Sequence, residues 1–233
     1  MMAVETWPPE NTRFFLIGTV HGDPRGFRRL SRFLDRFQPD LILVEMSPFA
    51  WAYRKTHGLS LHRTLNQRIR QAAALHGWDP KRALTHPQVK AIRRQIAMPF
   101  EFRASYQYAQ CHKSWLLLID RSDFSASMVA FWSELLSVRN LEYLLALPAS
   151  SPSLDIVNHY RKARTLVHPT PSRMPTMEHG CDGMEESLLQ DREESLAERI
   201  RGTIAAVVPK RCAYVGGWEH LRDQVKPPSL RCL

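Results

Sequence analysis

The chain has 233 residues, a hydrophobic fraction of 44% and a net charge of +9, so we expect one basic globular domain over residues 1–233. No run approaches the roughly 20 apolar residues of a membrane-spanning helix, and the first residues lack a secretory signal pattern, so neither is expected. The positive charge is spread over several amphipathic helices without a nucleic-acid-binding signature, so we do not expect a nucleic acid partner.

A short apolar strand followed by glycine and histidine opens the predicted fold. Residues 14–17 are apolar throughout, Gly18 ends the run, and His21 follows. A continuous apolar run of this length is typical of a strand buried on both faces. An amphipathic helix over 27–37 and a second apolar strand at 41–44 complete a βαβ unit, which implies parallel strands.

A helical insertion interrupts this pattern over residues 50–98. Apolar residues recur there at helical spacing, and the pairs Asp79-Pro80 and His86-Pro87 have the form of helix starts. We interpret the aromatic and apolar side chains of the insertion as core or cap packing rather than as a cofactor site.

The second half of the chain returns to the α/β pattern. A helix from residue 101, a third strand at 115–119 and helical residues over 124–147 are predicted. Residues 148–183 are rich in proline, serine, threonine and glycine, which predicts a mobile loop or lid with one short helix near 153–166.

The end of the chain repeats its beginning. A helix over 184–206 and a strand at 212–215 precede Gly217 and His220, so both ends have the order strand, then Gly-x-x-His. We therefore predict an α/β fold, with a central, mainly parallel sheet of two related βαβ halves, flanked by helices and carrying the helical insertion.

Polar side chains follow all four predicted strands. They are, in chain order, His21, Glu45, Asp120 with Arg121, and His220. Parallel strands bring their carboxyl ends to one edge of a sheet, where α/β proteins bind ligands. Singly, each residue is explained by a turn, a helix cap or an ion pair, and only their shared placement favours a site. We assign no site role to the other histidines, which are His57, His62, His76, His86, His112, His159, His168 and His179.

Six short motifs carry a family resemblance. They are GTVH at 18–21, LVEM at 43–46, EFRASYQYA at 101–109, LIDRSD at 118–123, DREESLAERI at 191–200 and GGWEHL at 216–221. In this order they resemble the TraB/PrgY/GumN family, which belongs with the Tiki proteases and is more distantly similar to erythromycin-esterase and ChaN-like proteins. The resemblance leaves out residues 50–98 and 148–183, and it implies an α/β domain of two related halves.

The resemblance implies a metal-dependent protease. The motif histidines and charged residues of such members would correspond to His21, Glu45, Glu101, Arg192, Glu193 and His220. The alternative is a non-catalytic protein that binds a peptide or small ligand, since PrgY-like members are thought to act on peptide pheromones.

The first hypothesis is therefore a metal-dependent, peptidase-like hydrolase. His21, Glu45 and His220 would hold Mn²⁺, Co²⁺ or Zn²⁺, because two imidazoles and a carboxylate are a common ligand set that leaves a position for water. The metal would lower the pKa of that water to about 7. Glu101 or Glu193 would transfer the proton. The substrate would be a peptide or another small molecule, and oligomeric state is not predicted.

Charged residues near the predicted metal complete this hypothesis. Arg192 falls on the buried stripe of the 184–206 helix, where a guanidinium needs partners. With Arg103 or Arg121 it would hold an oxyanion or a substrate carboxylate, while Asp120 would orient or protonate the substrate. The alternative for Arg192 is a purely structural bridge between carboxylates. We favour the functional role, because Glu193 and the strand-end acids lie on the same side.

The spacing of the four cysteines indicates the cellular compartment of the protein. They follow no C-x-x-C spacing, which argues against a zinc finger and against a disulfide framework. A reduced, cytoplasmic setting is expected.

Overall fold

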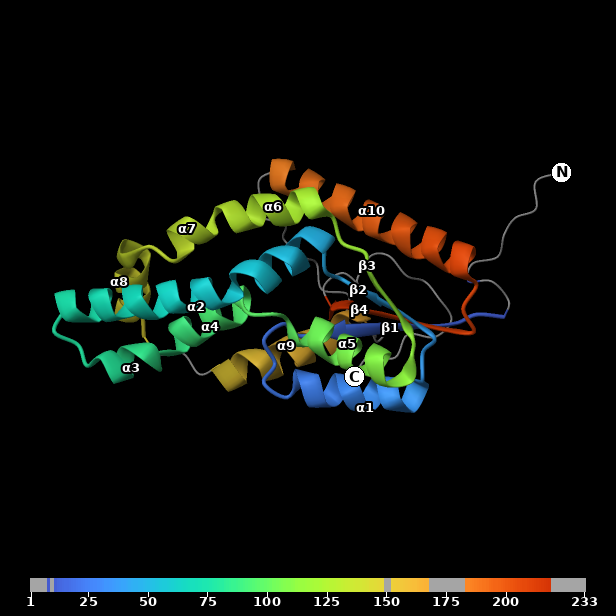
Figure 1. Cartoon of the computed structure of the whole chain (residues 1–233), viewed down its shortest axis with the longest axis horizontal. Helices are drawn as coiled ribbons and strands as arrows, with labels where there is room; N and C mark the ends of the chain where they lie inside the picture. Colours follow the sequence, from blue (N-terminus) through green and yellow to red (C-terminus); the bar gives the residue numbers. More distant parts are fainter. Residues whose placement is uncertain (1–7, 9–10, 149–151, 168–182, 219–233) are drawn as a thin grey trace.

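A four-stranded parallel sheet lies between layers of helices in the computed structural model, which describes residue 8 and residues 11–148, 152–167 and 183–218 (Figure 1). The strands are β1 (Arg13–Thr19), β2 (Leu41–Val44), β3 (Trp115–Leu118) and β4 (Arg211–Gly217), in the spatial order β1-β4-β2-β3. The predicted α/β class and its parallel sheet are confirmed.

The first and last strands are hydrogen-bonded neighbours. Each extends beyond its predicted end, because Gly18 pairs with Gly216 and Thr19 pairs with Gly217 in the β1–β4 ladder. The two Gly-x-x-His motifs therefore begin one residue apart at the same edge of the sheet. His220 lies outside the described residues.

Two helical layers cover the sheet. Helices α1 (Gly26–Phe37) and α5 (Phe100–His112) pack on one face, where the core includes Ile42 and Val44. Helix α10 (Gly183–Val207) packs on the other face, against Leu41 and Leu43 (Figure 1). This division follows from the strand period, because successive side chains point to opposite faces.

The buried stripe of α10 matches its prediction. Leu196, Ile200 and Ile204 are buried against the sheet, and Arg192 continues the stripe with 9% of its surface exposed. Burying an aliphatic side chain of this size contributes about 1.5–3 kcal/mol, so these three residues hold the helix in place. They also fix the position of Arg192 at the strand ends.

The insertion consists of α2 (Pro48–Leu75), α3 (Pro80–Leu84) and α4 (Pro87–Ile96). The predicted helix starts are confirmed, because Asp79 and His86 accept hydrogen bonds from main-chain N–H groups of the first turns of α3 and α4. The insertion forms a core of its own with α7 (Trp132–Leu135) and α8 (Val138–Ala146), so its apolar stripe is core packing, as predicted.

The predicted helical stretch 124–147 divides into three helices, α6 (Ser122–Ala130), α7 and α8. Ser137 explains the last division, because its hydroxyl accepts a hydrogen bond from the Asn140 N–H and so starts a new helix. None of the described helices is long and apolar enough to cross a membrane.

Helix α9 (Pro152–Val167) occupies the start of the predicted loop 148–183 and confirms the helix expected near 153–166. Its Ala163 packs on Val20 and Trp218, at the carboxyl ends of β1 and β4. Residues 149–151 and 168–182 of that predicted loop lie outside the described residues.

Candidate functional site

The predicted site residues form two groups on opposite faces of the sheet edge. Thr19 lies two residues after Ile17 in β1, so both side chains point to the α5 face of the sheet, where Thr19 contacts Glu101. Glu45 follows Val44 and lies on the α10 face, where it meets Arg192. The shared edge predicted from the sequence is present, and the sheet divides its residues between two environments.

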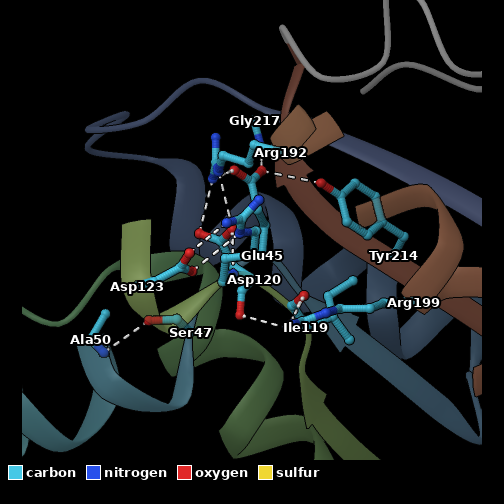
Figure 2. Close-up of polar contacts among 11 residues, drawn as sticks. Glu45, Ser47, Ala50, Ile119, Asp120, Asp123, Arg192, Arg199, Tyr214 and Gly217 are labelled. Carbon is cyan, nitrogen blue, oxygen red and sulfur yellow. Dashed lines mark hydrogen bonds and ion pairs between the residues drawn. The ribbon is translucent and has the colours of Figure 1, made fainter. Parts of the chain in front are cut away.

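The group on the α10 face is a charged bridge centred on Arg192 (Figure 2). Its Nη2 atom donates to Glu45 Oε1 at 2.7 Å and to Asp120 Oδ2 at 2.9 Å, and its Nε donates to Asp120 Oδ1 at 3.1 Å. The guanidinium also lies over the Phe124 ring, 4.8 Å from its centroid. Hydrogen bonds and charges from Asp120 and Glu45 outweigh the effect of burial and raise the pKa of Arg192 further above its ordinary value. These contacts match the structural alternative considered for Arg192.

Glu45 is held by donors at both of its oxygens. Its Oε2 accepts a hydrogen bond from the Gly217 N–H at 2.8 Å and from the Tyr214 hydroxyl at 3.1 Å, while Oε1 faces Arg192 (Figure 2). Burial, followed by the Glu45 charge, raises the pKa of Tyr214 well above its ordinary value, so that Tyr214 stays a donor. This environment favours a structural carboxylate, and the role of Glu45 as a metal ligand stays a prediction.

The group on the α5 face joins His21 to Glu101. The Nδ1 atom of His21 lies 2.9 Å from Glu101 Oε1, and the Thr19 hydroxyl lies 2.9 Å from the same oxygen. The Glu101 side chain is 6% exposed, whereas the His21 side chain is 64% exposed. A carboxylate only accepts hydrogen bonds, so Nδ1 of His21 is the donor in this contact.

A large cavity adjoins this second group. It has a volume of about 1040 Å³ and lies between the ends of β1 and β4, the loop before α5, the insertion and α9. His21, Glu101 and Arg103 line it, and so do Arg54 of α2 and Arg94 of α4. The volume is at the upper end of the range of small-molecule sites, about 300–1,000 Å³.

The remaining predicted residues have other surroundings. Arg121 forms an exposed ion pair with Asp123, two residues along the chain. Glu193 is half-buried, and its charge is close enough to contribute to the raised pKa of Tyr214. His220, the predicted third metal ligand, lies outside the described residues.

A divalent metal would find suitable donors on the α5 face. Imidazole is an ordinary ligand of Mn²⁺, Co²⁺ and Zn²⁺, and a metal-binding histidine commonly donates its other ring N–H to a carboxylate, as Nδ1 of His21 does to Glu101. Within the described ranges, no three His, Cys, Asp or Glu side chains form a group that could hold a metal. The pair therefore fits as part of a metal site.

Sequence patterns did not reveal several residues of the cavity. Arg54, Arg94 and His159 line it, but they lie in helices that the sequence identified only as packing elements or as part of a loop.

Asp23 connects α9 to the mouth of the cavity. Its Oδ2 atom accepts hydrogen bonds from the Tyr160 hydroxyl at 2.8 Å and from Arg29 Nη1 at 3.0 Å, and its Oδ1 accepts from the Arg25 N–H at 2.8 Å. Asp23 therefore holds the start of α1 and the side of α9 at once.

Comparisons of this chain with models of protein families, with curated proteins and with solved structures find no match. The resemblance to the TraB/PrgY/GumN family therefore rests on the six motifs and stays a prediction.

Proposed function

We propose that this protein is a hydrolase, metal-dependent and peptidase-like, whose reacting centre is the His21–Glu101 pair. The observation that carries the proposal is the 2.9 Å contact between His21 Nδ1 and Glu101 Oε1 on the wall of the cavity of about 1040 Å³. The motif resemblance supports the same class, and we propose that the chain is a divergent member of the TraB/PrgY/GumN family.

In this proposal the buried acid positions the exposed base. Glu101 is held by the Thr19 hydroxyl, so it fixes the orientation of the imidazole and its Nδ1 proton. Nε2 of His21 would then accept a proton from water, or bind a metal. Packing of α5 against α1 fixes the position of Glu101, which lies in the first turn of α5.

Mn²⁺, Co²⁺ or Zn²⁺ would be held by Nε2 of His21, with Glu101 orienting the imidazole through Nδ1, and the bound metal would supply hydroxide near neutral pH. The predicted His220 would add a second imidazole. Glu45 is a weaker candidate, because a guanidinium lies 2.7 Å from its Oε1.

The second candidate function is non-catalytic binding of a peptide or small ligand in the same cavity. The size of the cavity favours it, since about 1040 Å³ is enough to enclose a short peptide whether or not a reaction follows.

A peptide-library screen with the purified chain separates these functions. We expect cleavage in the presence of Mn²⁺, Co²⁺ or Zn²⁺, and loss of both cleavage and bound metal in His21→Ala. The control is His57→Ala, an exposed histidine of α2. Stoichiometric peptide binding without cleavage under every metal condition would replace the proposal by the second function.

A further inference from the structure

Three arginines of the cavity have no acidic partner among the residues that the structure describes. Among the described residues, Arg54, Arg94 and Arg103 take part in no ion pair, although all three line the cavity. Arg54 donates to the main-chain oxygens of Ala50 and Gln95, at 3.3 and 3.2 Å. The guanidinium of Arg103 lies over an aromatic ring of α1. These cations have the capacity to accept an anion.

The acidic residues of the cavity do not neutralise these arginines. Asp23 is paired with Arg29 and Tyr160, and Glu101 is paired with His21 and Thr19. The two carboxylates therefore have partners of their own, and the cavity keeps an excess of positive charge.

Arg54 is the strongest of the three candidates. It is half-buried, and its Nε–H is buried without a hydrogen-bond partner in the described part of the chain. Burial lowers the pKa of this guanidinium, yet arginine stays charged because its ordinary pKa lies far above neutral pH. A buried donor without a partner is costly, so Arg54 has donor capacity that its neighbours in the described part of the chain do not use.

Arg94 is held towards the sheet edge from the same wall. Its Nη1 donates to the main-chain oxygen of Gly22 at 2.9 Å, and Gly22 has a φ of +81°, a conformation that favours glycine. Arg54 contacts the oxygen of Gln95, the residue next to Arg94, so the insertion brings both arginines to one wall of the cavity.

The rest of the lining is largely apolar. Phe27, Met98, Phe100 and Trp218 contribute to it, which suits the apolar body of a ligand. The cavity thus combines cations on the insertion with apolar walls near the sheet.

We propose that the cavity binds an apolar ligand that carries a carboxylate, and that Arg54 and Arg94 contact this carboxylate. Arg103 adds positive charge to the same cavity. If the protein is a peptidase, as proposed above, this binding predicts a preference for apolar peptides with a free C-terminal carboxylate. To that extent the inference rests on the proposed function. Arginine suits this role because its planar fork of donors matches a carboxylate.

The test uses two dyes that differ by one charge. 8-Anilinonaphthalene-1-sulfonate is an apolar anion, and N-phenyl-1-naphthylamine is its uncharged counterpart. By fluorescence titration at low salt, we expect the wild-type protein to bind the anion at least about tenfold more tightly. The double variant Arg54→Gln/Arg94→Gln should lose this preference, and Arg70→Gln, an exposed arginine on α2, should keep it.

Competition with the bound anionic dye shows which kind of anion the cavity prefers. N-Acetyl-Leu-Leu-Phe with a free carboxylate should displace the anionic dye, while the same peptide as an amide and inorganic phosphate should not. The inference is overturned by absent dye binding, by equal binding of the two dyes, by a preference that survives in the double variant, or by displacement by phosphate alone. Because these are binding measurements, a lack of hydrolysis with binding intact would remove the proposed reaction and leave this inference standing.

Discussion

Arg192 and Asp120 form a two-point contact that joins α10 to the end of β3. Nε of Arg192 lies 3.1 Å from Oδ1, and Nη2 lies 2.9 Å from Oδ2. Both residues are buried, and Nη2 also reaches Glu45 at 2.7 Å. One cation thus compensates two buried carboxylates from separate strand ends, and its removal would leave both without this partner.

Arg192→Met should therefore destabilise the protein. We expect the free energy of unfolding to fall by about 3–5 kcal/mol, because two carboxylates would stay buried without their cation. Denaturant unfolding measures this change, and Arg201→Met, an exposed arginine on α10, is the matched control. Unchanged stability with abolished turnover per folded molecule would instead support the catalytic role expected from the sequence.

Gly216→Ala should disturb the same network without changing a charge. A Cβ atom at this position would lie 2.5 Å from Glu45 Oε2 and would overlap the Tyr214 hydroxyl, so Glu45 or Tyr214 must move. We expect a loss of about 1–3 kcal/mol from this overpacking, measured by denaturant unfolding. Gly202→Ala in α10 is the control, because nothing lies within 4 Å of its added Cβ. It should be neutral or stabilising by up to about 1 kcal/mol. Equal stabilities of the two variants would contradict the close packing at Gly216.

The docking of α9 should weaken at high pH. Burial, followed by the hydrogen bond to Asp23, raises the pKa of Tyr160 to about 12. The folded state therefore retains a proton that the unfolded chain releases near pH 10, so this contribution to stability is complete below about pH 10 and is lost as the pH rises towards 12. The ultraviolet difference titration between wild type and Tyr160→Phe should show a transition near pH 12. A transition near pH 10 would contradict the contact with Asp23.

Much of the fold was readable because strand-length apolar runs and proline helix starts are local signals. The predicted strand at 41–44 and the helix starts at Asp79 and His86 agree with the structure. Strands β1 and β4 are longer than predicted. Glycine usually weakens a strand, so the predicted strands stopped before Gly18 and Gly216, whereas these two residues pair with each other in the sheet.

The candidate site could be predicted only in part, because the sequence does not show how the strands pair. Whether two strand-end residues share a face depends on strand order and pairing, which one sequence does not reveal. Thus His21 and Glu45, predicted as ligands of one metal, have described partners on opposite faces of the sheet. The arginines of the insertion were missed because only tertiary packing brings α2 and α4 to the cavity.

The most direct test of the central claim is turnover of a cleaved library peptide by His21→Ala, Glu101→Gln and the double variant, each corrected for the folded fraction. Because the proposal makes the pair act as a unit, each single change should lower kcat/KM by about 10²-fold or more, and the double change should cost little beyond either one. Full activity in both single variants, at unchanged metal concentration, would contradict the account.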